Sequence, residues 1–398
     1  MREAVVIDAV RTPVGRYGGA LKDVRSDDLA ALCISEIVKR TKLDPGKVED
    51  VLIGCSNQAG DDNRNVGRMA LLLAGFPVEV GGQTINRLCG SALNAINSAA
   101  QAIKVNEGNI FIAGGTESMT RSPFVFGKSS TAFGRDVKVF DSTIGWRFVN
   151  PKMAEMYPPI GMGETAELVA EKHGITRQEQ DDFAYATQQK WAAANEAGKF
   201  KDEMVNVTIP QRKKDPIIFD KDEHPRPQTT MEQMKKLRPA FKKDGTVTAG
   251  NASGVNDGAA AVLMMDADTA KELGYKPMVR IVASAVAGVH PDYMGLGPIP
   301  ATKKALERAG LKIEDIGLAE LNEAFAAQSI PCIRELGLNP EIVNVNGGAI
   351  AIGHPLGSTG ARIFTTLIHE MKRRDVRYGL VSMCIGVGQG IATIVESV

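Results

Sequence analysis

The feature that most constrains the fold is a regular alternation of short apolar segments with longer segments of helical periodicity. The apolar segments have the length of buried strands, and we predict strands at 4–8, 51–53, 109–113, 278–285 and 379–383. We predict helices between them, at 26–40 with Ser26 as the cap, 89–104, 301–309, 323–336 and 358–371. Such alternation favours an α/β protein with mostly parallel sheets covered by helices.

Two parts of the chain carry a similar pattern. Residues 88–94 (LCGSALN) open a predicted helix that leads to a strand and a Gly-Gly pair. Residues 355–360 (PLGSTG) open another helix that leads to a strand and a glycine loop. An internal duplication explains this and would place an active site between the halves. The alternative explanation is chance recurrence of Gly-Ser at helix starts.

Composition limits the class of function. The chain has 398 residues, and 47 Lys and Arg are balanced by 47 Asp and Glu. Balanced charge argues against a general nucleic-acid or membrane-surface binder. The apolar run at the N-terminus is too short for a signal peptide, and no window is long enough to span a bilayer. We therefore expect a cytoplasmic globular protein of about two or three domains.

The five cysteines are dispersed and form no Cys-x-x-Cys pair, so we expect neither a disulfide framework nor a metal site. Cys33 and Cys332 lie in apolar helices and Cys55 follows a strand, which indicates small buried residues. Cys89 and Cys384 lie in glycine-rich stretches, as His354 does. Glycine lets a backbone approach a ligand closely, so these residues indicate a thiol-based acyl-transfer site.

Residues 121–247 differ in composition from the rest of the chain. They hold most of the aromatic residues, proline clusters and the basic run 212–214. The segment is either a solvated insertion or a cover domain with a basic wall for a phosphate-bearing ligand.

Seven motifs, in order along the chain, resemble those of the thiolase family of the acetyl-CoA C-acyltransferase type. They are 10–13 (VRTP), 86–91 (NRLCGS), 114–119 (GGTESM), 248–254 (TAGNASG), 322–326 (NEAFA), 353–357 (GHPLG) and 384–386 (CIG). The resemblance implies two duplicated βαβαβ halves in a five-layer αβαβα core with an inserted loop domain. The corresponding boundaries are 1–120 plus 248–275 for the N-terminal half, 121–247 for the loop domain and 276–398 for the C-terminal half.

The resemblance also implies the reaction, which is thiolytic cleavage of 3-oxoacyl-CoA by CoA and the reverse condensation. Cys89 would carry the acyl group, and His354 would take its proton. Cys384 would add or remove the proton at the α-carbon of acetyl-CoA. We expect the helix start at Cys89 to lower the pKa of its thiol. The alternative for Cys89 and Cys384 is a small buried residue.

Two oxyanion holes follow from the same resemblance. One uses the backbone N–H groups of Cys89 and Gly386, and the other uses His354 and a water held by Asn322. The alternative role of Asn322 is a helix cap, because Asn is favoured there.

The resemblance carries Arg226, Ala249 and Ser253 to CoA binding, and Met162 and Phe241 to the acyl-thioester end. CoA is a substrate here, so no resident cofactor is expected. The implied partners are acyl-CoA, CoA and further copies of the chain in a homodimer or homotetramer, with no nucleic acid and no membrane.

Departures from the family pattern bear on the substrate. Gly161 stands where short-chain biosynthetic thiolases carry His, which argues against the alternative function of condensing two acetyl-CoA to acetoacetyl-CoA. The stretch 143–148 (TIGWRF) is similar to thiolases of aromatic-acid breakdown that act on 3-oxoadipyl-CoA, which makes Arg147 a candidate partner of a substrate carboxylate.

Two other classes of protein fit the sequence less well. Decarboxylating ketoacyl synthases typically carry His at the position of Asn322 and lack a counterpart of Cys384, so the sequence disfavours them. A catalytically inactive CoA-binding scaffold is disfavoured because every expected reactive group is present.

Overall fold

The structure is a computed structural model that describes residues 2–398. A ten-stranded sheet runs through it in the order β12-β13-β14-β11-β1-β10-β5-β3-β4, with β2 paired to β10. The strands are β1 (Ala4–Arg11), β2 (Gly15–Arg16), β3 (Asp50–Gly54), β4 (Gly81–Ile85), β5 (Ile110–Ser118), β10 (Asn256–Asp266), β11 (Val279–Gly288), β12 (Leu318–Leu321), β13 (Tyr378–Ile385) and β14 (Gln389–Ser397).

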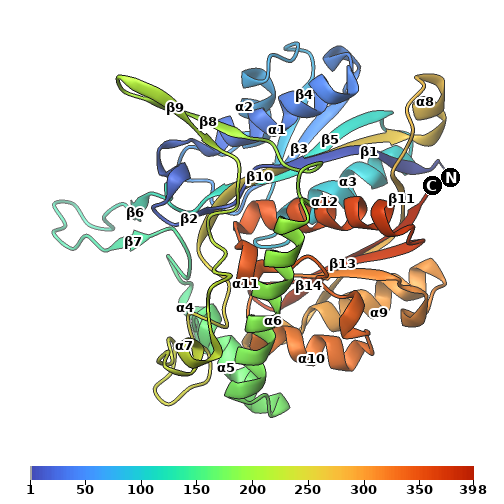
Figure 1. The fold of residues 1–398 in the computed structure, drawn as a ribbon. Coiled ribbons are helices and arrows are strands. Elements are labelled where there is room, and N and C mark those ends of the chain that lie inside the picture. Colours follow the sequence, from blue (N-terminus) through green and yellow to red (C-terminus); the bar gives the residue numbers. More distant parts are fainter. Residues whose placement is uncertain (1) are drawn as a thin grey trace.

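The sheet has two halves, one with strands β1 to β5 and β10 and the other with β11 to β14. The halves lie in separate layers with helices between and outside them (Figure 1). Helices α3 and α12 lie between the halves and contact strands of both, while α1 and α2 cover the first half and α9 and α10 the second. This arrangement confirms the expected five-layer α/β fold. The helices are α1 (Ser26–Thr41), α2 (Val66–Leu73), α3 (Ser91–Lys104), α8 (Ala267–Glu272), α9 (Pro298–Ala309), α10 (Ala326–Leu336), α11 (Ala349–Ile352) and α12 (Leu356–Arg374).

The two halves repeat one strand order. In the first half, β1, β10 and β5 pair antiparallel in turn, and β5, β3 and β4 pair parallel. In the second half, β11, β14 and β13 pair antiparallel, β13 and β12 pair parallel, and a parallel bridge joins Ala319 to Val343. The bridge stands where β4 stands in the first half. The duplication inferred from the sequence is thus confirmed.

The prediction of mostly parallel sheets is wrong. In each half one strand, β10 or β14, lies antiparallel to both of its main neighbours. β14 follows β13 through a tight turn in which Val387 and Gly388 have positive φ, and a tight hairpin requires antiparallel strands.

Four of the five predicted helix starts differ from the structure by two or three residues, and the cap of the fifth differs as well. Arg25, not Ser26, occupies the cap position of α1. Helix α3 begins at Ser91, which leaves Cys89 in the turn before it. Helix α10 begins at Ala326 with Phe325 at its cap position, which leaves Asn322 in the loop after β12. Cys89 and Asn322 therefore lie in loops that follow strands β4 and β12.

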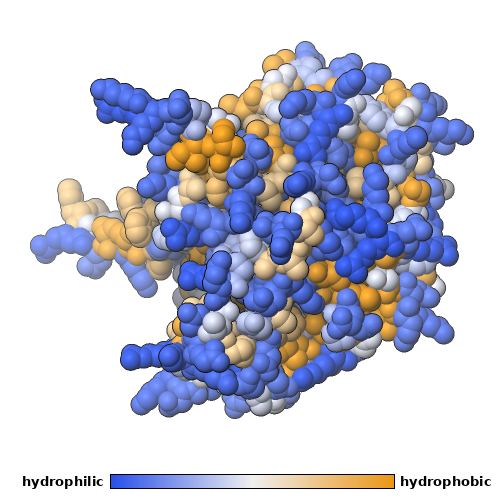
Figure 2. All heavy atoms as spheres, viewed as in Figure 1, coloured by the Kyte–Doolittle hydropathy of each residue, from blue (hydrophilic) through white to orange (hydrophobic). Residues whose placement is uncertain are grey.

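The inserted segment 121–247 is built from hairpins and helices. These are β6 (Phe124–Phe126), β7 (Val139–Asp141), α4 (Pro151–Met156), α5 (Met162–His173), α6 (Arg177–Glu196), β8 (Val207–Gln211), β9 (Lys214–Phe219) and α7 (Met231–Lys235). Buried Arg11 of β1 ties it to the core through Glu203 at 2.6 Å and Asp222 at 2.7 Å. The hairpins β6–β7 and β8–β9 project from the body, and both carry apolar side chains at the surface (Figures 1 and 2). Within residues 2–398, no helix combines the length and apolar character needed to cross a membrane.

Candidate active site

Cys89 lies in a tight turn between β4 and α3. Leu88 has a left-handed backbone with φ of 48°, and the Ser91 N–H donates to the Leu88 carbonyl at 3.1 Å. A Cβ atom on Gly90 would lie 2.6 Å from Ile385 Cδ1. Glycine at this position therefore allows the Cys89 turn to approach the end of β13, where the two halves meet.

The Cys89 thiol is protonated at rest. Although the residue borders a cavity, protein surrounds the sulfur, and loss of hydration raises the pKa of the Cys89 thiol to about 11. The expected lowering of this pKa is therefore wrong for the free protein, because desolvation outweighs the helix start. The backbone N–H groups of Gly386 and of Cys89 itself lie beside the sulfur and favour the thiolate. An acyl oxygen on Cys89 would lie within reach of both groups.

The loop that carries His354 is fixed at its backbone. Gly353 has φ of 112°, and a Cβ atom there would lie 2.6 Å from Asn256 Cγ. Asn256 Oδ1 accepts a hydrogen bond from the His354 backbone N–H at 2.9 Å. Glycine at 353 and asparagine at 256 together hold His354 in place.

The hydrogen bonds of the His354 ring define its tautomer. Thr359 Oγ1 lies 2.7 Å from Nδ1 and donates its own proton to the Pro355 carbonyl at 2.8 Å. A hydroxyl has only one proton, so Thr359 must accept from Nδ1–H. The other ring nitrogen, Nε2, is left unprotonated and can act as a base.

Burial keeps His354 uncharged. Loss of hydration, together with the nearby Arg362 guanidinium, lowers the pKa of His354 to about 3. Asn322 Nδ2 lies 3.4 Å from His354 Nε2, and Asn322 Oδ1 has no hydrogen-bond partner within residues 2–398. Because α10 begins beyond it, Asn322 is not a helix cap.

Cys384 lies within β13 rather than after it, and it is buried. Burial raises its pKa well above the ordinary value, and a charge on Cys89 raises it further. Cys33, Cys55 and Cys332 are buried as expected. No three His, Cys, Asp or Glu side chains in residues 2–398 gather in a way that could hold a metal ion.

A cavity of about 390 Å³ opens beside Cys89. Three of the ten residues matched to catalysis, CoA binding or the acyl-thioester end line it, namely Cys89, Met162 and Gly386. His354, Asn322 and Cys384 are buried and are not among its described lining residues. The Asn322 N–H donates to the Ser382 carbonyl of β13, the strand that carries Cys384, at 3.0 Å. The remaining lining residues are Ser56, Asn57, Asn86, Leu88, Ser142, Thr143, Ile144, Gly145, Trp146, Arg147, Leu356 and Val387.

The four other binding candidates lie outside this lining, three of them for CoA and Phe241 for the acyl-thioester end. Phe241 packs edge-on to Phe325 with ring centroids 6.0 Å apart, and a Cβ atom on Gly163 would collide with its ring. The Ser253 N–H donates to the Ala324 carbonyl at 2.9 Å. Phe241 and Ser253 thus pack against the 322–326 segment. Arg226 and Ala249 are exposed on the surface.

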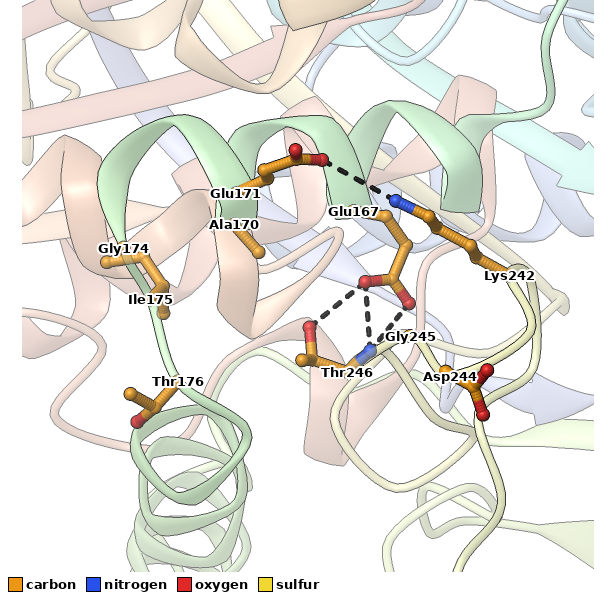
Figure 3. Close-up of a pocket in the computed structure, with 10 residues that line it drawn as sticks. All are labelled: Glu167, Ala170, Glu171, Gly174, Ile175, Thr176, Lys242, Asp244, Gly245 and Thr246. Atoms are coloured by element: carbon orange, nitrogen blue, oxygen red, sulfur yellow. Dashed lines mark hydrogen bonds and ion pairs between the residues drawn. The ribbon is translucent and has the colours of Figure 1, made fainter.

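Glu167 of α5 holds the segment that leads to Ala249 and Ser253 (Figure 3). Its carboxylate accepts hydrogen bonds from the backbone N–H groups of Thr246 at 2.9 Å and Val247 at 2.8 Å. Lys242, on the same segment, pairs with Glu171 at 3.5 Å. The loop that carries two CoA-binding candidates is therefore fastened to the inserted domain.

Glu117, whose role the motifs did not indicate, organises the cavity wall. Its carboxylate accepts from the backbone N–H groups of Ser56 at 2.9 Å, Asn57 at 3.1 Å and Gly357 at 2.8 Å. Those bonds join the loop after β3 to the start of α12. The signal was a single carboxylate inside an otherwise uncharged, fully buried strand, since buried charges need partners.

Comparisons with known proteins agree with this architecture. Family models described as the thiolase N-terminal domain and the thiolase C-terminal domain match residues 4–268 and 275–397. The chain is 55% identical to the 3-oxoadipyl-CoA/3-oxo-5,6-dehydrosuberyl-CoA thiolase of Escherichia coli (strain K12), covering 100% of both chains. It is 54% identical to a beta-ketoadipyl-CoA thiolase of Acinetobacter baylyi, again over 100% of both. The Bacillus anthracis acetyl-CoA acetyltransferase structure matches with a TM-score of 0.94 and 44% identity, covering 100% of this chain and 99% of that one. The chain therefore belongs to the thiolase family.

Proposed function

We propose that this thiolase cleaves 3-oxoacyl-CoA with CoA, releasing acetyl-CoA and a shortened acyl-CoA, through an acyl-enzyme on Cys89. The observation that carries the proposal is the surroundings of Cys89, which borders a cavity and has two backbone N–H groups beside its sulfur. Cysteine suits the reaction because the enzyme-bound thioester is close in energy to the thioester of the substrate.

In the first step, the Cys89 sulfur attacks the 3-oxo carbon while His354 Nε2 takes the thiol proton. The N–H groups of Cys89 and Gly386 stabilise the oxyanion that forms. The bond between C2 and C3 then breaks, and its electron pair becomes the enolate of acetyl-CoA. Cys384 supplies the proton to that enolate, and Asn322, through a water, and His354 stabilise the enolate oxygen. In the second step, the Cys384 thiolate takes the proton of the CoA thiol and the CoA sulfur attacks the acyl carbon. The Cys89 sulfur then leaves and recovers its proton from the His354 imidazolium.

Neutral starting groups suit this sequence of steps. A thiol with a raised pKa and an imidazole with a lowered pKa form no ion pair at rest. Proton transfer to His354 therefore accompanies attack on the carbonyl, because the electron pair left on the sulfur is used at once to form the bond to carbon.

For the substrate we propose 3-oxoadipyl-CoA, whose cleavage gives acetyl-CoA and succinyl-CoA. Two relatives, 55% and 54% identical, carry names for this thioester, and Gly161 replaces the His of short-chain biosynthetic thiolases. The alternative is condensation of two acetyl-CoA, which the name of the B. anthracis protein at 44% identity favours.

The test is thiolysis of 3-oxoadipyl-CoA and of acetoacetyl-CoA, followed by loss of the 3-oxoacyl thioester absorbance. We expect turnover of both by the protein alone, also after gel filtration with a chelator, because CoA is a substrate and no resident cofactor is proposed. The Cys89→Ala variant, checked for folding by circular dichroism, should be inactive on both. If the native protein turned over neither thioester, the proposal would be overturned.

A further inference from the structure

Arg147 is the one charged side chain among the described residues that line the Cys89 cavity. The other lining residues are uncharged polar groups, such as Asn57 and Asn86, or apolar groups, such as Ile144 and Met162. Within residues 2–398, Arg147 takes part in none of the ion pairs. A guanidinium beside the nucleophile, without a carboxylate of its own, is suited to bind an anionic group of the ligand.

The loop that carries Arg147 is held at both ends. Asn57 Nδ2 donates to the Ser142 carbonyl at 3.2 Å, and Trp146 Nε1 donates to the Ile160 carbonyl at 2.9 Å. The rings of Phe140 and Phe148 pack with centroids 4.9 Å apart, which closes the loop on itself. The backbone at Arg147 is therefore fixed before a ligand binds, which reduces the entropy lost on binding.

We propose that Arg147 selects acyl chains that end in a carboxylate, by pairing its guanidinium with that carboxylate. The inference rests on the proposed thiolase function. When C3 of a 3-oxoadipyl chain is bonded to the Cys89 sulfur, the terminal carboxylate stands three carbon–carbon bonds further along. Cys89 and Arg147 line the same cavity of about 390 Å³, so one short chain can reach from one to the other. The cavity also has apolar lining residues, namely Leu88, Ile144 and Met162, which suit the methylene groups of such a chain.

The other anion that could meet Arg147 is a phosphate of CoA. The phosphates are separated from the thioester by the whole pantetheine arm, whereas Arg147 shares a cavity with the residue that receives the acyl group. Arg226, the residue matched to CoA binding in the family, lies outside this cavity. The acyl carboxylate is therefore the partner that we assign to Arg147.

The experiment compares 3-oxoadipyl-CoA with 3-oxohexanoyl-CoA, which has the same carbon chain without the terminal charge. The native protein should prefer the charged chain. Arg147→Gln should lower kcat/KM for 3-oxoadipyl-CoA by roughly 10- to 100-fold, the loss expected for one bidentate charge-assisted contact, and leave 3-oxohexanoyl-CoA unaffected. Arg147→Lys should recover part of the loss. The control, Arg135→Gln, removes the same charge from the exposed hairpin and should change neither value.

Each of the other possible results contradicts either the role of Arg147 or the proposed function. An equal loss on both thioesters would overturn the inference and indicate a contact with CoA or a structural role. Unchanged values on both would also overturn it. If the native protein cleaved only the uncharged chain, the thiolase function would stand and the inference would fail. If it cleaved neither, the proposed function itself would fail.

Discussion

Thr359 determines which nitrogen of His354 is available as a base. It accepts from Nδ1–H at 2.7 Å because its own proton is committed to the Pro355 carbonyl. Asn322 lies on the opposite side of the ring, 3.4 Å from Nε2. The imidazole is therefore held between a fixed acceptor and the amide that is proposed to bind water, in an environment that keeps it neutral.

Replacing Thr359 with Val removes the acceptor and leaves Nδ1–H without a partner. We expect kcat for thiolysis to fall roughly 10-fold, because a lost buried hydrogen bond of about 1–2 kcal/mol no longer holds the ring. The KM for CoA should not change. Thr359→Ser, which keeps the hydroxyl, should retain most of the rate. Equal rates for the Val and Ser variants would contradict the positioning role.

The raised pKa of Cys89 sets how its alkylation depends on pH. With a pKa of about 11, the thiolate fraction keeps rising through neutrality. We expect the rate of iodoacetamide modification at Cys89 to increase about tenfold per pH unit between roughly pH 6 and 9, without a plateau. Peptide mass spectrometry identifies the site, and Cys89→Ala is the control, since the other cysteines are buried. A plateau below neutrality would indicate a preformed thiolate–imidazolium pair.

At this scale the sequence points to candidate reactive residues but not to their ionisation. Cys89, His354 and Asn322 could be found from motifs, because each lies in a distinctive short stretch. The pKa of Cys89 could not, since it depends on how much protein surrounds the sulfur after the two halves meet. Thr359 is five residues from His354, and its role depends on where its single proton goes.

At the scale of elements, the active-site loops are held together by strands and helices that carry no reactive group. Glu117 of β5 is the clearest example, because it binds the loop after β3 and the first turn of α12 at once. The cavity wall and the helix that follows His354 are thereby kept in a fixed relation.

Glu117→Gln tests this linkage. The amide nitrogen of Gln cannot accept from the Ser56 or Gly357 N–H, so at least one buried donor loses its partner. We expect the free energy of unfolding to fall by about 1–3 kcal/mol, measured by urea denaturation. Glu107→Gln, an exposed residue in the turn after α3, should leave it unchanged. Equal stabilities of the two variants would show that Glu117 is not a structural link.

Strands with a clear length and flanking loops, such as β1 and β5, could be predicted from the sequence, as could the amphipathic α3. Strands β10 and β14 could not. Their continuous apolar runs cannot be told from buried helix segments by periodicity alone, and burial throughout, which β5 shares, does not distinguish them. Their antiparallel pairing depends on partners that are distant in sequence. Helix α6 was missed because its residues are mainly polar.

At the scale of the whole molecule, the hairpin β6–β7 presents an apolar face to solvent. Phe124 and Phe126 alternate along β6, so they share one side, and Val139 pairs with Phe126 across the hairpin. Their side chains are 73%, 66% and 55% exposed. Apolar groups gathered on a projecting hairpin mark a contact surface. We propose that copies of the chain associate through it into dimers or tetramers.

Light scattering coupled to size-exclusion chromatography tests this assembly. The native protein should elute with the mass of two or four chains. A double variant, Phe124→Asp with Phe126→Asp, should shift toward smaller species, because two carboxylates replace the apolar face. Lys128→Asp, on the same exposed hairpin, should not change the mass. A monomeric native protein, or an unchanged mass in the double variant, would contradict the proposal.

The central claim is that one sulfur, that of Cys89, carries the acyl group between the two halves of the reaction. Intact-mass and peptide mass spectrometry after incubation with acetyl-CoA test it most directly. The native protein and Cys384→Ser should each gain one acetyl group, located on the peptide that contains Cys89, and Cys89→Ala should gain none. An acetyl group on Cys89→Ala, or on any other residue of the native protein, would contradict the account.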